Sequence, residues 1–332
     1  MLFLGQLFLV MRKFGLTNGA RWREIMIRTF DELLAAAKRD VLPTISVAIA
    51  QDKKVLQAIK LAEELGLARG MLVGNQSEIE GLAKEVGLNL SHHDIVHVED
   101  KAEGCQVAIQ LVREGVADVP MKGIVETSMI LRAVLDTENG LKTGGLISHV
   151  GVFDIDGFDR LLILTDSAMN IAPSLEDKVK ILENSLVVAS ALSIRIPKIA
   201  ILCATETVNP KMEATLDAAE LTRLNREEGY FGHSLVKGPL ALDNAISSDS
   251  AKIKGITDPV AGKADILLVP DIEAGNILNK SLEYFSKAEK AGVIMGAREP
   301  IILTSRASSD MSKMHSIALA LLIQEKRSLS QW

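Results

Sequence analysis

A serine and an arginine stand where an apolar segment of the chain ends, and together they could hold an anion. Ser305 and Arg306 directly follow the run 301–304, which is typical of a buried strand. We expect a helix to start within a few residues, so free backbone N–H groups would join the hydroxyl and the guanidinium in an oxyanion or phosphate site. A helix cap beside a surface arginine is the alternative interpretation.

A second group of hydroxyl and arginine side chains occurs earlier in the chain. Thr127 and Ser128 follow the segment 123–125, which we predict to be a strand, and Arg132 lies one helical turn after Ser128 on the same face. These side chains could hold another part of the same anion. Lys122 precedes the predicted strand and adds positive charge, although a lysine at the start of a strand is usually only solvated.

A third polar group, Glu273, Gly275 and Asn276, follows the fully apolar run 266–269. A proline ends this run, as is typical of a parallel strand buried on both faces. Glu273 and Asn276 are three residues apart, so a helix that begins here would present both on one side. Capping of the helix dipole by acidic residues is the competing explanation.

Asp166 and Asn170 form a fourth group, after the run 160–165. In isolation, turn formation is the first explanation for these two residues. The same arrangement nevertheless recurs at several predicted strand ends, and open α/β sheets bind ligands at the carboxyl ends of their strands. The sequence therefore predicts one shared crevice.

Several motifs of other enzyme classes are absent from the sequence. It contains no G-x-x-x-x-G-K-[ST] loop, no G-x-G-x-x-G and no G-x-S-x-G elbow. The six histidines lack H-E-x-x-H spacing and an accompanying cysteine cluster, so we predict no metal site.

Composition excludes some partners. The net charge of −6 and the aromatic content of 4% argue against nucleic acid, whereas 48% hydrophobic residues over 332 positions allow a large core. Cys105 and Cys203 are too few for a disulfide framework, and we interpret them as reduced residues of a cytoplasmic protein.

The first 25 residues do not fit the pattern that follows. The apolar run 1–11 is about half the length that spans a bilayer, and Arg12 and Lys13 follow it rather than precede it. We predict that 1–25 is an extension outside the fold, that Met26 is the functional first residue, and that the protein does not associate with membranes.

Strands and helices alternate from residue 26 onward, which predicts a parallel sheet. The runs 146–153 and 160–165 flank an Asp-Gly turn and should form an antiparallel pair. Ser174 should cap a long helix, and Asn209-Pro210 should begin another. The predicted fold class is α/β, with two domains, mainly parallel sheets, helices on both faces and a cleft between the domains.

One signature extends these expectations. The chain reads PVAGKA at 259–264, then an apolar strand, then PDIEAGN at 270–276. With Thr304-Ser305-Arg306 and Thr127-Ser128…Arg132, it resembles the phosphate acetyl/butyryltransferase family over nearly its whole length from Met26. The run 161–178, LLILTDSAMNIAPSLEDK, looks more like the butyryl branch than the acetyl branch.

The resemblance implies an isocitrate-dehydrogenase-like fold with domains 26–138 plus 298–332 and 139–297. It implies the reaction of acyl-CoA with phosphate to give acyl phosphate and coenzyme A, with butyryl or a similar short or branched acyl group. No cofactor beyond these substrates and no metal is implied, and the similar proteins are commonly homo-oligomers.

The resemblance also implies roles for residues. Ser305 and Arg306 match the catalytic Ser-Arg of the family, and Arg132 matches an arginine of its substrate site. Thr127, Ser128, Asp166, Asn170, Glu273, Gly275 and Asn276 are the expected substrate-binding residues. Acetyl-type members carry an aspartate, proposed as the base for the thiol of coenzyme A, where this chain has Ser312. Asp310, Glu273 and Asp166 are the candidate bases instead.

Three alternatives stay open. A phosphate acetyltransferase would share every motif above. An NAD-dependent dehydrogenase of the related fold would need a metal-binding cluster and a nicotinamide pocket. A non-catalytic acyl-CoA-binding protein would keep the cleft without needing both arginine sites.

Overall fold

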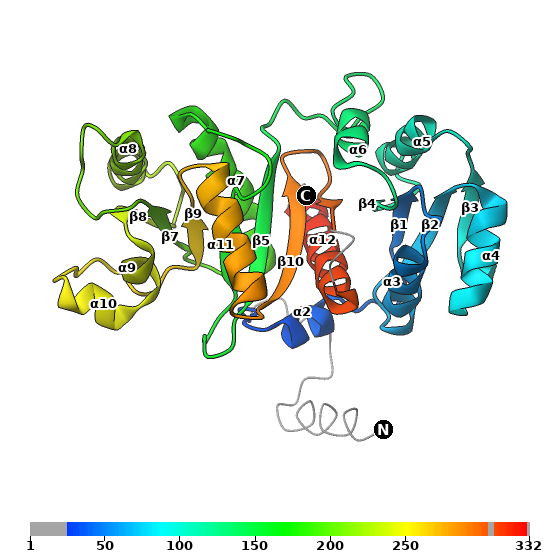
Figure 1. The fold of residues 1–332 in the computed structure, drawn as a ribbon, viewed down its shortest axis with the longest axis horizontal. Coiled ribbons are helices and arrows are strands. Elements are labelled where there is room, and N and C mark those ends of the chain that lie inside the picture. The colour runs from blue at the N-terminus through cyan, green and yellow to red at the C-terminus, as the bar shows by residue number, and fades with distance from the viewer. Residues whose placement is uncertain (1–24, 305–308, 331–332) are drawn as a thin grey trace.

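The computed structural model describes residues 25–304 and 309–330, which are built around one continuous β-sheet (Figure 1). Its strands are β1 Thr44–Ala48, β2 Arg69–Gly74, β3 Asp94–His97, β4 Val119–Lys122, β5 Ser148–Asp154, β6 Leu162–Thr165, β7 Lys198–Leu202, β8 Leu235–Leu240, β9 Ile266–Leu268, β10 Glu289–Met295 and β11 Ile301–Ile302. They lie in the order β3-β2-β1-β4-β11-β10-β5-β6-β9-β7-β8. The pairings of β10 with β11 and β5, and of β5 with β6, are antiparallel, and the others are parallel.

Helices cover both faces of this sheet. They are α2 Phe30–Ala37, α3 Lys53–Glu64, α4 Gln76–Val86, α5 Lys101–Arg113, α6 Thr127–Val134, α7 Leu175–Ala191, α8 Glu213–Glu228, α9 Leu242–Ile246, α10 Ser248–Ile253, α11 Ile272–Tyr284 and α12 Asp310–Ser330, with a short 3-10 turn at Leu90–His92. The α/β class with a mainly parallel sheet is therefore confirmed. In the part of the chain that the structure describes, no helix is long and apolar enough to cross a membrane.

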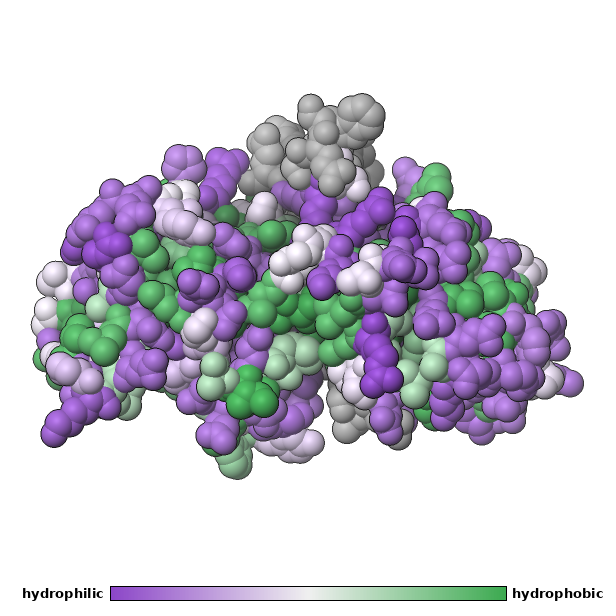
Figure 2. All heavy atoms as spheres, turned by 90° about the horizontal axis from the view of Figure 1, so that it is seen from above, coloured by the Kyte–Doolittle hydropathy of each residue, from purple (hydrophilic) through white to green (hydrophobic). Residues whose placement is uncertain are grey.

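The two faces of the sheet carry different cores. On one face a single apolar cluster runs along the whole sheet and includes side chains of α2, α3, α7 and α12. On the other face a cluster under α5 and α6 is separate from a second cluster near α9 and α11. Strand alternation assigns the faces, because Val293 and Met295 of β10 belong to the continuous cluster and Ile294 belongs to the one under α5. Hydrophobic side chains lie along the middle of the molecule between hydrophilic flanks (Figure 2), as this layering requires.

Several predicted elements are confirmed. β5 and β6 form the antiparallel pair, and Ser174 and Asp177 form a capping box at the start of α7. The signature segment folds as expected, with a buried β9 followed by α11, where the Asp271 carboxylate accepts a hydrogen bond from Ala274 N. Local sequence sets each of these elements.

The predicted strand at 123–125 is wrong. The strand is β4, and Lys122 is its last residue rather than a solvated residue before it. Lys122 is buried, and its Nζ donates to the carbonyl oxygens of Gly123 and Val125 at 3.3 and 3.0 Å. Pro120 and Lys122 interrupt the apolar pattern, so the strand is defined by its neighbours β1 and β11 rather than by its own sequence.

The predicted helix start at Asn209-Pro210 is also wrong, because α8 begins at Glu213. The Asn209 side chain instead accepts a hydrogen bond from Lys211 N. This bond closes a short turn that precedes the helix.

The predicted extension falls almost wholly on residues 1–24, which lie outside the described residues. The division into 26–138 plus 298–332 and 139–297 stays a prediction. In the sheet, the C-terminal strand β11 lies between β4 and β10, so it joins the two halves of the chain.

Candidate active site

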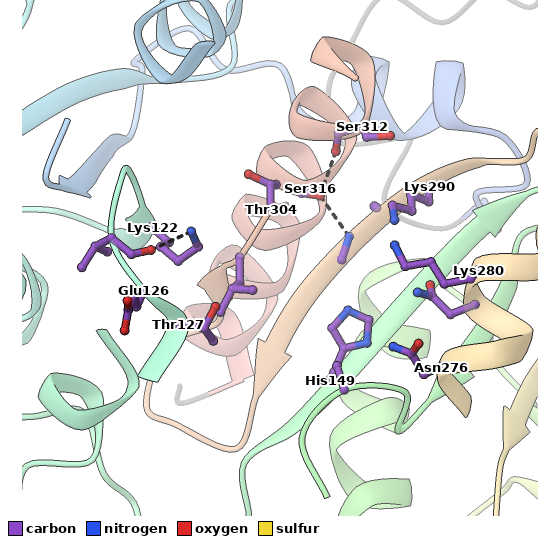
Figure 3. A pocket seen from close by; sticks show the side chains of 16 residues that line it. Lys122, Glu126, Thr127, His149, Asn276, Lys280, Lys290, Thr304, Ser312 and Ser316 are labelled. Carbon is purple, nitrogen blue, oxygen red and sulfur yellow. Dashed lines mark hydrogen bonds between the residues drawn. The ribbon is translucent and has the colours of Figure 1, made fainter. Parts of the chain in front are cut away.

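A cleft of about 530 Å³ lies on the sheet face that carries two separate cores, near the start of α6 and beside α11 (Figure 3). It is lined by Lys122, Val125, Glu126, Thr127, His149, Ala168, Asn276, Asn279, Lys280, Lys290, Ala291, Gly292, Leu303, Thr304, Ser312 and Ser316. An adjoining cavity of about 250 Å³ shares Lys122 and Thr304 with it. This hollow is the candidate for the crevice predicted from the recurring polar strand ends, of which Thr127 and Asn276 line it.

The floor of the cleft is a polar spot on β5 and β10. His149 of β5 lies on the same face as Gly151 and Gly292, which are paired across the two strands. A Cβ atom at Gly292 would lie 3.1 Å from His149 Nε2, and one at Gly151 would lie 3.4 Å from His149 Cε1. The lack of a side chain at Gly292 thus leaves the room that the imidazole occupies, whereas a Cβ atom at Gly151 would meet Phe153 more closely than His149.

The turn after β6 holds Asp166 and Asn170. The Asp166 carboxylate accepts hydrogen bonds from the backbone N–H groups of Ala168, Met169 and Asn170 and from Asn170 Nδ2, at 2.6–3.2 Å. Asn170 Nδ2 also donates to Ile147 O at 2.9 Å. Neither residue lines the cleft, whereas Ala168 does. These bonds match the turn-forming interpretation, and the turn places Ser167 against His149.

Helix α11 packs against this turn through Gly275. A Cβ atom there would lie 2.7 Å from Asp166 O and 2.9 Å from Ser167 Cα, so a side chain would push the helix away. Asn276 lines the cleft and donates through Nδ2 to Ser167 O at 3.4 Å. Glu273 is exposed and does not line the cleft.

The β4–α6 side carries the group around Thr127. Thr127 lines the cleft together with Glu126, whose side chain makes no capping hydrogen bond to the first turn of α6. Ser128 and Arg132 are exposed and do not line it. They lie about 100° or more around the helix from Thr127, because successive residues turn by about 100°.

A third side is formed by the end of β11 and the start of α12. Thr304, Ser312 and Ser316 line the cleft, and Ser316 Oγ accepts a hydrogen bond from Gly292 N at 2.9 Å. Ser305 and Arg306 lie outside the described residues. Thr304, which directly precedes this pair, and Ser312, six residues after Arg306, border the cleft.

The electrostatic balance of the cleft is positive. Its lining contains three lysines, Lys122, Lys280 and Lys290, and one carboxylate, Glu126, among the described residues. Lys280 and Lys290 share the carboxylate of Glu283 at 3.0 and 2.6 Å. Positive charge in a chain whose net charge is −6 favours an anionic ligand.

Sequence reasoning missed His149, Lys280 and Lys290. The local signal for His149 was weak: a polar residue alternating with glycine in an otherwise apolar strand. Its surroundings come from Gly292, more than 140 positions away, and from the turn at Ser167. In the ranges 25–304 and 309–330, no group of three metal-ligating side chains occurs.

Comparisons with known proteins agree with this geometry. Residues 103–321 match the family model described as phosphate acetyl/butaryl transferase. A phosphate butyryltransferase of Clostridium beijerinckii is 47% identical over 298 residues, which cover 90% of this chain and 98% of the relative. A phosphate acetyltransferase of Rhizobium meliloti is 40% identical over 302 residues, covering 91% and 95%.

Solved structures give the same result for the fold. A branched-chain phosphotransacylase from Enterococcus faecalis superposes with a TM-score of 0.76 at 35% identity, over 85% of this chain and 99% of that one. A 4-hydroxythreonine-4-phosphate dehydrogenase from Klebsiella pneumoniae reaches a TM-score of 0.51 at 12% identity, over 85% and 99%, and shares the fold alone.

Fold, cleft and relatives together define the class of the protein, which is an α/β acyltransferase. More specifically, the chain belongs to the phosphate acetyl/butaryl transferase family.

Proposed function

We propose that the protein transfers an acyl group between coenzyme A and inorganic phosphate, by direct attack of one bound substrate on the other. The cleft carries this proposal: its lining is cationic, and it is bordered by Thr304, which directly precedes the Ser305-Arg306 pair, and by Ser312 of the following helix. Relatives that align over almost their whole length add support, since their names describe acyl transfer to phosphate.

The reaction needs the phosphate oxygen about 3 Å from the thioester carbon, so the phosphate must be fixed and its charge offset. Arg306 is suited to this task because a guanidinium binds phosphate through two parallel hydrogen bonds. Arg132 would add a second guanidinium from the exposed side of α6 when the anion is bound. Thr127, which already lines the cleft, would orient the same anion.

As the tetrahedral intermediate forms, negative charge develops on the carbonyl oxygen. Hydrogen-bond donors aimed at that oxygen contribute about 3–4 kcal/mol in comparable sites. We assign this role to Ser305, and we assign substrate contacts to Asn276, which points into the cleft in Figure 3. Ser128 is the second donor expected from the sequence, but it does not line the cleft.

We propose butyryl or a similar short or branched acyl group as the substrate, with acetyl as the alternative. One methylene changes transfer into an apolar pocket by about 0.8 kcal/mol, so neighbouring chain lengths should differ only a few-fold. Steady-state rates with acetyl- to hexanoyl-CoA would distinguish the two, because a maximum at acetyl would favour the alternative.

The direct test is thiol release from butyryl-CoA with and without phosphate, run beside an assay of NAD reduction. Phosphate-dependent release with stoichiometric acyl phosphate supports the proposal. Release that does not depend on phosphate would contradict it, as would reduction of NAD by a hydroxylated substrate.

We further propose a homo-oligomer in the cytoplasm, with 26–138 plus 298–332 and 139–297 as domains on either side of the cleft. Ile277, Tyr284 and Phe285, on and just after α11, are 68%, 65% and 87% exposed, which supports a covered surface there. Light scattering coupled to size-exclusion chromatography would test the oligomer, and a monomeric mass would contradict it.

A further inference from the structure

The three carboxylates predicted as candidate bases are poorly placed to take a proton from a thiol. Asp310 is exposed and forms an ion pair with Lys313 at 3.2 Å. Glu273 is exposed outside the cleft, and the Asp166 carboxylate is occupied by the hydrogen bonds of its turn. Ser312, which stands where acetyl-type members have an aspartate, lines the cleft but cannot act as a carboxylate base.

We propose that His149 is the general base that removes the proton from the thiol of coenzyme A, a role that rests on the acyl transfer proposed above. His149 lies at the floor of the cleft, beside Asn276 and Lys280 of α11 and near Lys290 of β10 (Figure 3). The only carboxylate among the described lining residues is Glu126, which belongs to the opposite side.

The orientation of the ring supports this role. Nδ1 of His149 lies 3.0 Å from the Oγ of Ser167, which is buried. In the tautomer with the hydrogen on Nδ1, that nitrogen donates a hydrogen bond to Ser167 Oγ. Nε2 then has a free lone pair and can accept a proton. Gly292 lies beside Nε2, where any side chain would fill the approach.

The protonation state also fits a base. Burial lowers the pKa of His149, the nearby carboxylate of Asp166 counteracts part of this effect, and Lys290 adds to it. The imidazole is therefore neutral near pH 7. The other polar or charged side chains that line the cleft are Asn276, Asn279 and Lys280 of α11, Lys122, Glu126 and Thr127 across the cleft, Thr304, and Ser312 and Ser316 of α12.

The step balances in both directions. With acyl phosphate as substrate, the S–H proton passes to His149 Nε2 while the sulfur attacks the acyl carbon, so a C–S bond forms and the C–O bond to phosphate breaks. In the reverse direction, a phosphate oxygen attacks the thioester carbon, the C–S bond breaks, and the imidazolium returns its proton to the leaving sulfur. The lysines of the cleft stabilise the thiolate in either direction.

The test measures the rate of acyl transfer from butyryl phosphate to coenzyme A for the wild type and for His149→Gln, between pH 7 and pH 9.5. We expect kcat of the variant to fall by about 100-fold or more at pH 7, because general-base catalysis contributes about 10²- to 10⁴-fold. An ordinary thiol with a pKa of about 8.5 is only about 3% ionised at pH 7 and about 90% at pH 9.5. The deficit of the variant should therefore shrink by about 30-fold over this range.

A purely positioning role predicts a different result. Its loss would be constant with pH and would raise KM for coenzyme A, whereas loss of a base lowers kcat and spares KM. Gly292→Ala keeps the imidazole but places a methyl group next to Nε2, so it should also lower kcat. This second variant keeps the proposal testable if His149→Gln does not fold.

Controls separate the outcomes. His233→Gln changes an exposed histidine away from the cleft and should leave the rate and its pH profile unchanged. A deficit of His149→Gln that is less than about threefold, or that does not change with pH, would overturn the proposal, as would a pH-dependent deficit in Glu126→Gln instead. Absence of acyl transfer in the wild type would overturn the proposed function itself, and this role with it.

Discussion

The turn at 166–170 and the His149 site lie side by side, yet their polar groups are used differently. In the turn, the Asp166 carboxylate accepts four hydrogen bonds from within the same segment. At the site, His149 uses one ring nitrogen to contact Ser167, and its other nitrogen faces the cleft. A polar side chain near the cleft is therefore part of the scaffold when hydrogen bonds within its own segment satisfy it, and it is available for chemistry when one of its atoms has no such partner.

The largest expected effect is on catalysis and comes from removing Arg306. Arg306→Ala should lower kcat/KM by at least about 100-fold, since a transition-state contact of roughly 3 kcal/mol is lost. The free energy of unfolding should stay within about 0.5 kcal/mol, because we assign Arg306 to binding of the phosphate and not to the core. Steady-state kinetics and urea unfolding would measure both. Arg226→Ala, on the remote helix α8, is the matched control, and a mutant that kept most of its activity would remove Arg306 from the site.

The packing of α11 on the turn at 166–170 is tested by Gly275→Ala, which should lower the free energy of unfolding by about 3 kcal/mol. The added Cβ would meet backbone atoms of Asp166 and Ser167 at 2.7 and 2.9 Å, and backbone cannot move away as a flexible side chain can. Gly81→Ala is the matched control: it is also a helical glycine, and its Cβ would meet nothing within 4 Å. That control should gain about 0.5–1 kcal/mol from helix propensity. Equal unfolding midpoints in urea would refute the close approach of α11.

Asp166→Asn should have a smaller effect, lowering the free energy of unfolding by about 2 kcal/mol. An asparagine has one acceptor oxygen where the turn uses two, so donors of the turn would be left unsatisfied. Activity should fall with stability, because Ser167 would no longer be fixed against His149. Thermal unfolding and kcat measured on the same preparation would check this, and a variant of wild-type stability would show that the turn does not depend on the carboxylate.

The smallest effect should come from Glu273→Gln. Its side chain is exposed outside the cleft, so kcat should change by less than about twofold and stability by less than about 0.5 kcal/mol. Kinetics at pH 7 would suffice. A loss of tenfold or more would make Glu273 the base and argue against His149.

The parts of the molecule that were predictable depend on local sequence. The buried β9, the Asp271 cap and α11 follow from an apolar run, a proline and a capping carboxylate that are neighbours in the chain. β4 was not predictable in this way, because Pro120 and Lys122 break its pattern and strands from distant segments bury it.

The same limit applied to the site. Thr127 and Asn276 were predicted from strand ends and line the cleft, whereas Ser128 and Arg132 lie on the exposed side of α6. His149 could not be found, since the room for its ring depends on Gly292, on a strand far away in the chain. Whether a polar group is satisfied depends on such long-range neighbours, which one sequence does not display.

A crystal structure with coenzyme A and phosphate bound would test most directly whether both substrates meet at His149. We expect phosphate in the cleft next to Thr127, contacted by Arg132 and Arg306, with the thiol within hydrogen-bond distance of His149 Nε2. Coenzyme A bound elsewhere, for example in the separate cavity of about 430 Å³ near Ser190 and His233, with the two guanidinium groups directed to different sides of the molecule, would contradict this expectation.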